Sequence, residues 1–426
     1  MRRRTMVLGV VLLLLAILVA SLPPPVAAGP EPPTLASTAY NTQRKVVRAT
    51  DGTVLAAITV NASGVPQVRV IRSQGGVSWS TLPSPSTLGN RSDRSALAID
   101  SLGRLHLAWT EPAAVDLQVF YSMYDGTEWS PMEQLSHSPG YAGFPSVAVD
   151  GLDRVHVVWY GFDGAFYQIY YRGRSDSGWS DERALTNEAV DATNPAIALS
   201  PSGSIHVAWF RENRAATFTE IAYLRTDGTT VLESSVLSSP GIPSLDPSLV
   251  VDGVGGVHVV WTARDNGTSR IEAAHRTTSW SPVETVSGSL EGQHASLALD
   301  GNSRLHVAWE GADGRIYLQE REGAWSAPAP ITATGTNRYP SLRWSQHVNP
   351  LCGDNSKLDL IWTEEDAGTT RVAYRAIDTS VPCVVGPTGL DWGLVAMSIL
   401  AGAALGFGAF ALWLRRRWYP KPPARP

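Results

Sequence analysis

Five histidines recur about once every 50 residues and are the most regular set of side chains that could bind a metal or move a proton. They are His106, His156, His206, His258 and His306. Zinc needs its ligands at about 2 Å, whereas equivalent residues on neighbouring packed sheets lie about 10 Å apart. We therefore expect no metal and no other cofactor. We expect each histidine to hydrogen-bond within its own repeat, to the turn that carries Asp100, Asp150, Asp252 and Asp300.

Each of these histidines begins an apolar run that ends in tryptophan and belongs to a repeat of about 50 residues. The clearest copy, residues 145–186, has four short runs rich in β-branched and aromatic residues, separated by turns with glycine. Such runs are too short for helices and predict strands. Since the middle runs are apolar on both faces, both faces of each sheet must be covered. We predict an all-β fold, a β-propeller of about seven four-stranded blades over residues 29–377.

The last copy of the repeat lacks a fourth strand, because its pattern stops near residue 377. Residues 34–41 precede the first copy and have the length of a strand. We expect them to complete the last blade and so close the ring by pairing the N-terminus with it. The alternative is a six-bladed ring with the first or last copy set apart.

Both ends of the chain carry apolar runs with basic flanks. Residues 1–28 have the pattern of a signal peptide. Residues 392–414 contain no charge, are long enough to span a bilayer, and are followed by three arginines. The positive-inside rule places the tail 415–426 in the cytoplasm and the propeller outside, joined by the linker 378–391. We expect a single-pass protein of the cell membrane, and the Gly402–Gly406 spacing leaves a homodimer through this helix open.

Composition and cysteine content limit the partners and the compartment. Charged residues make up 17% of the 426 residues and the net charge is -5, so we expect no nucleic-acid partner. Cys352 and Cys383 are the only cysteines, and in an exported chain we expect a disulfide between them; two unpaired thiols are the alternative. Asn61, Asn90 and Asn266 lie in glycosylation sequons, expected on loops of one side of the ring.

A turn followed by Trp-Ser recurs at Trp79, Trp129, Trp179, Trp280 and Trp325. Together with the strand pattern of residues 146–180, it resembles the bacterial neuraminidase repeat of sialidase-like propellers, over roughly residues 42–377. In that family the turn is the Asp box, a folding element, and residues 122–129 hold a degenerate copy. Active sialidases also carry a Phe-Arg-Ile-Pro-like motif, where this chain reads Asn41 to Val47 with Arg44 out of register. We therefore assign no catalytic residue, and a diverged exo-sialidase or other glycoside hydrolase is the alternative.

The loops that join the second to the third strand, and one blade to the next, emerge on one side of a propeller. Such loops often carry function, and aromatic side chains beside carboxylates suit a sugar or a peptide. We expect a non-catalytic module that binds a glycan or an extracellular protein; a scaffold for another membrane protein is a further alternative. For Phe162 and Phe166 the alternative is that their rings only cover the end of the blade. The candidate ligand-binding residues are Asp116, Phe162, Asp163, Phe166, Tyr167, Arg211, Arg343, Glu364 and Glu365.

Overall fold

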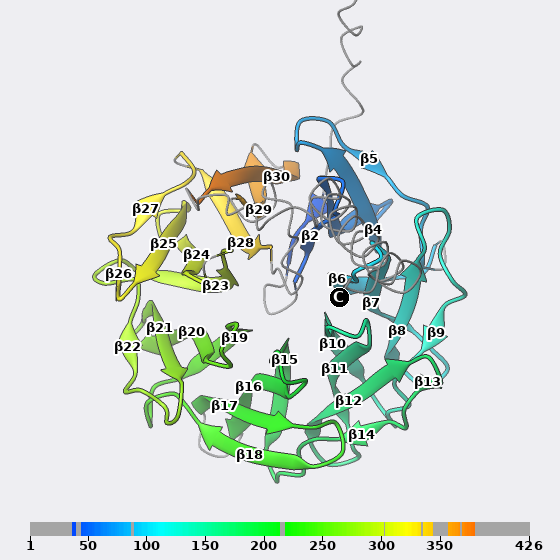
Figure 1. Ribbon diagram of the computed structural model, residues 1–426, viewed down its shortest axis with the longest axis horizontal. Coiled ribbons are helices and arrows are strands. Elements are labelled where there is room, and N and C mark those ends of the chain that lie inside the picture. The colour runs from blue at the N-terminus through cyan, green and yellow to red at the C-terminus, as the bar shows by residue number, and fades with distance from the viewer. Residues whose placement is uncertain are drawn as a thin grey trace, which may run out of the picture. The chain divides into compact units, whose positions relative to one another are not determined.

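Seven antiparallel sheets surround a central axis in the computed structural model (Figure 1). The structure describes residues 36–39, 44–86, 89–213, 218–301, 303–333, 335–343, 357–366 and 369–379. The predicted all-β propeller with seven blades is confirmed. These described residues form no helix that could cross a membrane. The expected signal peptide, transmembrane segment and tail, and both cysteines, lie outside them and stay predictions.

The blades follow one another along the chain, and within each blade the strands run from the axis outward. Blade 1 contains Ala36–Ser37 (β1), Val46–Arg48 (β2), Thr53–Ala62 (β3), Val65–Gln74 (β4) and Ser80–Thr81 (β5). Blade 2 contains Asp93–Ile99 (β6), Leu105–Pro112 (β7), Leu117–Tyr124 (β8) and Glu133–Gln134 (β9). Blade 3 contains Ala142–Val149 (β10), Val155–Phe162 (β11), Tyr167–Ser175 (β12), Gly178–Trp179 (β13) and Arg183–Ala184 (β14).

The remaining blades repeat this order. Blade 4 contains Asp191–Leu199 (β15), Ile205–Asn213 (β16), Phe218–Thr226 (β17) and Val231–Val236 (β18). Blade 5 contains Ser244–Val251 (β19), Val257–Asp265 (β20), Thr268–Arg276 (β21) and Glu284–Thr285 (β22). Blade 6 contains Gly292–Leu299 (β23), Leu305–Gly311 (β24), Ile316–Glu322 (β25), Ala324–Trp325 (β26) and Ala329–Pro330 (β27). Blade 7 contains Thr336–Leu342 (β28), Lys357–Asp366 (β29) and Thr369–Asp378 (β30).

The hydrophobic core lies between the blades. Apolar side chains from each pair of neighbouring sheets form a cluster, and seven such clusters follow one another around the ring. The tryptophans in the middle of the second strands, such as Trp109 and Trp159, are fully buried in them. Burial of one large apolar side chain contributes roughly 1.5–3 kcal/mol. Because each sheet is covered on both sides, its strands are apolar on both faces, as the sequence indicates.

The expected role of residues 34–41 is wrong. Of this segment the structure describes residues 36–39, and Ala36–Ser37 pairs with β3 of blade 1, not with the last blade. Both β1 and β2 pair with β3: β1 pairs near the end of β3 and β2 near its start. Together they take the place of the innermost strand of blade 1. The other six innermost strands have a bulge at the corresponding place, so the chain between β1 and β2 is an insertion at that bulge. Among the described residues, blade 7 has three strands.

The ring closes instead through side chains. One hydrophobic cluster joins β2 and β3 of blade 1 to Ile361 and Val372 of blade 7. Thr38 donates its backbone N–H to the Thr363 hydroxyl at 2.8 Å, and its own hydroxyl donates to the Tyr339 carbonyl at 2.8 Å. A buried ion pair joins Arg48 of blade 1 to the Asp359 carboxylate of blade 7. Among the described residues, blades 1 and 7 are therefore fastened by packing and polar contacts and share no sheet.

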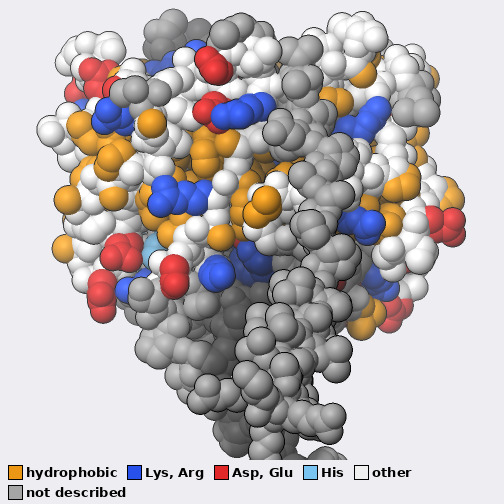
Figure 2. All heavy atoms as spheres, turned by 90° about the horizontal axis from the view of Figure 1, so that it is seen from above, with side chains coloured by type: hydrophobic (Ala, Val, Ile, Leu, Met, Phe, Trp, Pro, Cys, Tyr) orange, Lys and Arg blue, Asp and Glu red, His pale blue; other side chains and the backbone are white. Residues whose placement is uncertain are grey.

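The surface of the ring has no dominant sign of charge where Figure 2 shows it. Lys and Arg side chains alternate there with Asp and Glu side chains, among hydrophobic side chains of the blades. A protein that follows a nucleic-acid backbone presents a continuous basic track. This face carries no such track among the residues that the structure describes.

Candidate functional site

One side of the ring carries the turns between second and third strands, and we call it the loop-bearing face. The turns after β7, β11 and β20 lie there, since each second strand runs toward this side. Asp116, Phe162, Asp163, Phe166 and Arg211 all lie on it, as the sequence predicts. Asp116 is exposed, and its carboxylate accepts the backbone N–H of Leu117 at 2.6 Å.

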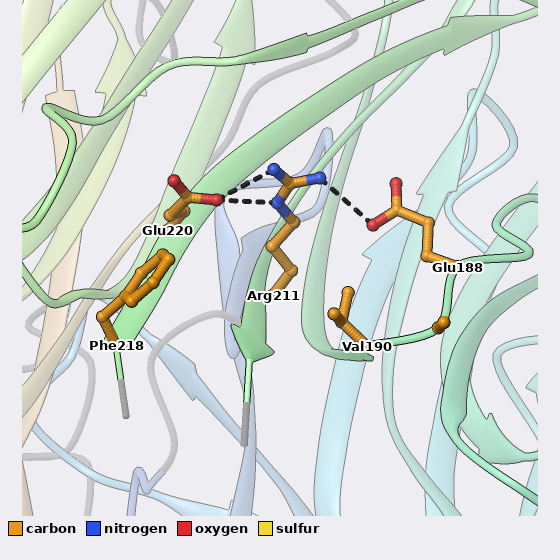
Figure 3. A pocket seen from close by; sticks show the side chains of 6 residues that line it. Glu188, Val190, Arg211, Phe218 and Glu220 are labelled. Carbon is orange, nitrogen blue, oxygen red and sulfur yellow. Dashed lines mark hydrogen bonds and ion pairs between the residues drawn. The ribbon is translucent and has the colours of Figure 1, made fainter. Parts of the chain in front are cut away.

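A cavity of about 490 Å³ opens on the loop-bearing face of blade 4 (Figure 3). Arg211, at the end of β16, lies between two carboxylates: its Nη2 is 2.9 Å from Glu220, and its Nη1 is 3.2 Å from Glu188. Phe218 and Val190 line the cavity beside them. These hydrogen bonds keep the pKa of Arg211 above its usual value although burial acts to lower it. The cavity thus presents fixed charges of both signs next to an aromatic ring.

An aromatic cluster covers blade 3 on the same face. Tyr167 contacts Tyr160 edge-on with ring centroids 5.3 Å apart, and Phe162 lies 5.5 Å from Tyr167. Tyr141 and Phe144 contact Tyr160 at 5.5 and 5.4 Å. Tyr167 links the cluster to blade 4, because its backbone N–H donates to the carboxylate of Asp191, the first residue of β15. Phe162 and Tyr167 are half-buried, so their outer surfaces stay accessible.

Asp163 shapes the turn between β11 and β12. Its carboxylate accepts backbone N–H groups from Phe166 at 2.8 Å and Ala165 at 2.7 Å. These two hydrogen bonds, the one from Phe166 first, lower the pKa of Asp163. The side chain therefore holds the turn that presents Phe166 and Tyr167.

Arg343 does not belong to this face. It follows β28, and its backbone N–H donates to the Asp359 carbonyl near the start of β29, whereas Glu364 and Glu365 lie near the end of that strand. Five residues of strand separate Asp359 from Glu364, which is about 16 Å at 3.3 Å per residue. Arg343 is buried and lies 3.5 Å from the Asp359 carboxylate. Arg343 was a candidate ligand-binding residue, but the structure places it among the buried contacts of Asp359 and away from the loop-bearing face.

Glu364 and Glu365 pair with arginines of their own blade. Glu364 is 2.9 Å from Arg371, and Glu365 is 3.9 Å from Arg338. Both pairs are partly exposed at the rim, where screening by solvent makes ion pairs weak. These carboxylates are accessible on the loop-bearing face but are separated from the Arg211 cavity by the breadth of the ring in Figure 1.

The three sequon asparagines are exposed, as expected. Asn90 and Asn266 lie on loops of the loop-bearing face, while Asn61 lies at the end of strand β3 next to its turn on that face. Glycosylation itself stays a prediction.

The repeated histidines form hydrogen bonds inside their blades, as the sequence predicts. The Nε2 atoms of His106, His156, His258 and His306 lie 3.1–3.4 Å from the aspartates of the preceding turns. Burial lowers the pKa of His106. Burial alone would raise the pKa of Asp100, but hydrogen bonds from His106 and Arg104 bring it to about 2. Two partners in this arrangement were not predicted from the sequence. They are the arginine that donates to the aspartate and the tyrosine whose hydroxyl contacts Nδ1 in blades 2, 3 and 4.

Six side chains near the axis were also missed. They occupy the same place at the bulge of the innermost strand, each with a left-handed φ between 50° and 54°, which is costly for residues with a Cβ. They differ in chemistry and are Arg94, Phe144, Asn194, Asp246, His294 and Tyr339. A proline follows four of them in the sequence, and this recurrence could have indicated the position.

Neighbours among these six are in contact. The Arg94 guanidinium lies 4.7 Å from the Phe144 ring centroid, and His294 lies 3.7 Å from the Asp246 carboxylate. The Tyr339 ring is tilted against the His294 ring, with centroids 4.7 Å apart. Arg44 lies deeper and donates to the Ile197 carbonyl at 2.7 Å, and burial lowers its pKa to about 9. Arg44 thus binds backbone groups of a distant blade.

Comparison with known proteins identifies the fold. No protein-family model and no curated protein sequence matches this chain. An ulvan lyase of a polysaccharide lyase family matches at a TM-score of 0.57 with 9% identity, over 83% of this chain and 95% of that chain. The α-L-arabinanase of Penicillium chrysogenum, complexed with arabinobiose, matches at 0.50 with 12% identity, over 83% of this chain and 99% of that chain.

A sialidase from Streptococcus pneumoniae superposes less closely, at a TM-score of 0.46 with 11% identity, over 68% of each chain. We base nothing on that likeness. At these identities the matches show the fold alone. The chain has a seven-bladed β-propeller architecture, similar to that of solved propellers whose names refer to polysaccharides.

Proposed function

We propose that this chain is a membrane-anchored extracellular propeller that binds a glycan, without cleaving it, through the loop-bearing face. The observation that carries the proposal is the cavity at Arg211, with carboxylates on both sides and Phe218 beside it. Sugars are bound by charged groups that take several hydroxyl hydrogen bonds and by aromatic rings that cover their apolar faces. The aromatic cluster of blade 3 extends this surface, which suits a chain of several sugar units.

Binding is favoured over hydrolysis by how the two glutamates are held. Glu188 and Glu220 share a single guanidinium, which lies between them. A glycosidase needs its two carboxyl groups to face one scissile bond, with one of them able to give up a proton. The ulvan lyase and arabinanase matches support a glycan over a protein as the ligand.

The test is glycan binding by the full chain in detergent, on an array of extracellular polysaccharide fragments. Arg211→Gln should weaken binding at least tenfold, because it leaves the two carboxylates without their shared cation. The matched control is Arg276→Gln, which removes a comparable pair with Glu233 at the other end of a blade and should leave binding unchanged. Equal affinity of Arg211→Gln and the wild-type chain would refute the site. If the wild-type chain cleaves fluorogenic glycosides and Arg211→Gln abolishes this cleavage, the function of the site is hydrolysis and the binding proposal is refuted.

A further inference from the structure

The most exposed apolar side chains gather on the side opposite the loop-bearing face. Leu102, Leu152 and Val254, which we call the apolar tips, are 72%, 76% and 92% exposed and occupy the same place in the turn between the first and second strands of their blades. Val77, 91% exposed, follows the third strand of blade 1 on this side. Among the described residues, one aliphatic side chain of comparable exposure, Val115 at 69%, lies on the loop-bearing face. Single exposed apolar residues are ordinary, but a set of them on one side marks a contact surface.

The turns that carry the apolar tips are held in place by hydrogen bonds. The backbone N–H of Leu102 donates to the Asp100 carboxylate at 3.0 Å, and the corresponding hydrogen bonds in blades 3 and 5 are 2.9 and 3.0 Å long. The turns of blades 2 and 3 are also joined to each other, since Ser101 donates its backbone N–H to the Asp153 carboxylate at 2.9 Å. Because the tips stand on ordered turns, they can enter a partner surface without the entropic cost of ordering a loop.

The chain leaves the ring on the same side as the apolar tips. Strand β30 runs away from the loop-bearing face, and Thr379 follows its end. The Thr379 carbonyl accepts a hydrogen bond at 2.6 Å from Arg304, which belongs to the turn of blade 6 that corresponds to those of the tips. The predicted membrane span begins at residue 392, so residues 380–391 separate it from the ring. Fully extended, these residues reach at most about 40 Å.

A linker of this length does not by itself orient the ring. The eight residues of β7 run between the two sides of the ring and span about 26 Å at 3.3 Å per residue. The linker is longer than this thickness, so it would let either side face the membrane. The apolar tips supply the preference, because transfer of aliphatic side chains from water into the boundary of a bilayer is favourable.

The charges on this side favour a lipid surface without net charge. Beside the tip of blade 3, Arg154 pairs with Asp150 of its own turn at 2.6 Å. Farther from the axis, the turns between third and fourth strands of blades 2 to 4 contain no Lys or Arg. Each of these turns presents an exposed aspartate, namely Asp125, Asp176 and Asp227. An anionic lipid surface would repel these carboxylates, whereas a zwitterionic one would not.

We propose that the side opposite the loop-bearing face lies on a zwitterionic lipid surface, with the apolar tips among the lipid head groups. This contact rests on the membrane anchor of the proposed function and adds an orientation to it. The loop-bearing face then points away from the bilayer, where an extracellular glycan can reach the Arg211 cavity. The lipid contact and the glycan site lie on opposite sides of the ring, so either can fail alone.

The experiment places the full chain in phosphatidylcholine nanodiscs with and without a nitroxide-labelled lipid. A fluorescent thiol label is attached to Leu152→Cys, and the wild-type chain with its own two cysteines gives the background. The nitroxide lipid should remove about half or more of the emission, because an apolar face on a bilayer enters its boundary by ~5–10 Å. The matched control is Val115→Cys, whose label should keep its emission because the thickness of the ring separates it from the lipid. Undiminished emission at Leu152→Cys, or equal losses at both positions, would overturn the proposal.

A second variant removes all three tips, by Leu102→Ser, Leu152→Ser and Val254→Ser together, and serine is the residue that blade 4 has at this place, Ser202. A label at Val77→Cys should be quenched by the nitroxide lipid when the tips are present and clearly less when they are replaced. Equal quenching in both backgrounds would show that the tips do not hold the ring on the lipid, and would refute the proposal.

The outcomes also separate the lipid contact from the membrane anchor. A full chain that does not stay with the nanodiscs would overturn the anchor and the lipid contact with it, and would leave the glycan site untouched. A chain that stays with the discs while its label at Leu152→Cys is unquenched would overturn the lipid contact alone. If that label is also shielded from iodide in the water, a protein covers the tips in place of lipid.

Discussion

In blades 2 and 3 the repeated histidine joins three parts of its blade. In blade 2, His106 contacts Asp100 of the preceding turn through Nε2 and Tyr121 of the third strand through Nδ1. Arg104 donates to the same carboxylate and keeps it charged beside the buried ring. The aspartate partner could be predicted because it precedes the histidine at a constant spacing. The tyrosine could not, because a contact across two strands depends on a register that one sequence does not reveal.

Blade 4 departs from this pattern and should make stability depend on pH. Ser200 replaces the aspartate, and burial lowers the pKa of His206 to about 4, with a smaller effect of Arg225. In the unfolded chain a histidine titrates near pH 6.5. Between these values the unfolded chain binds a proton that the folded chain does not, so the free energy of unfolding falls as the pH falls.

Urea unfolding at pH 7.0 and pH 4.5 measures this effect. The wild-type chain should lose about 2–3 kcal/mol more than His206→Gln between the two values, at about 1.4 kcal/mol per pH unit. Equal losses for the wild-type chain and His206→Gln would contradict the assignment.

At the scale of elements, a recurrent pair of residues fastens the outermost segment of the blades. An aliphatic residue donates its N–H to the third strand, and the following serine or threonine hydroxyl accepts an N–H from it. Leu135 and Ser136 do so with Val119 of β8, both at 2.8 Å. Thr186, Ser238, Ser287 and Thr332 repeat the hydroxyl contact in blades 3 to 6. The outer strands can therefore be very short and still complete a blade.

Ser136→Ala should lower the free energy of unfolding by about 1–3 kcal/mol, because it leaves the buried Val119 N–H without its acceptor. It also removes the hydrogen bond from Ser136 to Gln118, at 2.7 Å. Urea denaturation followed by tryptophan fluorescence measures the change. The exposed Ser177→Ala is the control and should stay within about 0.5 kcal/mol of the wild-type chain. A similar small effect of both variants would show that the outer segment is held by packing alone.

The strands themselves were predictable, because apolar runs and glycine turns recur in every copy. The two-residue strand β1 was not, since an insertion separates it from β2 and hides the bulged innermost strand found in the other blades. Within the site, Arg211 and the aromatic residues of blade 3 could be chosen because the sequence predicts long loops there, although the structure places Arg211, Phe162 and Tyr167 at the ends of strands. Their glutamate partners could not, because Glu188 comes from a connection between blades and Glu220 from within a strand. The prediction that Arg343 lies on the loop-bearing face failed because a sequence does not give the direction of a side chain.

At the scale of the whole ring, closure depends on the junction of blades 1 and 7. The Asp359 carboxylate is fully buried there, and it accepts hydrogen bonds from Arg48 of blade 1 and from Tyr374. Arg343 lies 3.5 Å from the same carboxylate. Removing one partner of a buried ion pair costs about 3–5 kcal/mol, because the remaining charge stays buried.

Asp359→Asn should therefore lower the free energy of unfolding by about 3 kcal/mol or more in urea denaturation. Glu364→Gln is the control in the same blade, since it removes the exposed pair with Arg371 and should cost about 1 kcal/mol or less. A cost for Asp359→Asn no larger than that of the control would mean that hydrophobic packing alone closes the ring.

The central claim, that a glycan binds the loop-bearing face at the Arg211 cavity, is tested most directly by hydrogen–deuterium exchange of the full chain with and without a glycan that binds it. Residues 160–169, 188–192 and 209–212 should exchange more slowly when the glycan is bound, because they line the cavity and the aromatic cluster. The turns on the opposite side, such as residues 100–104 and 150–154, should not change. Protection confined to that opposite side, or no protection at saturation, would contradict the claim.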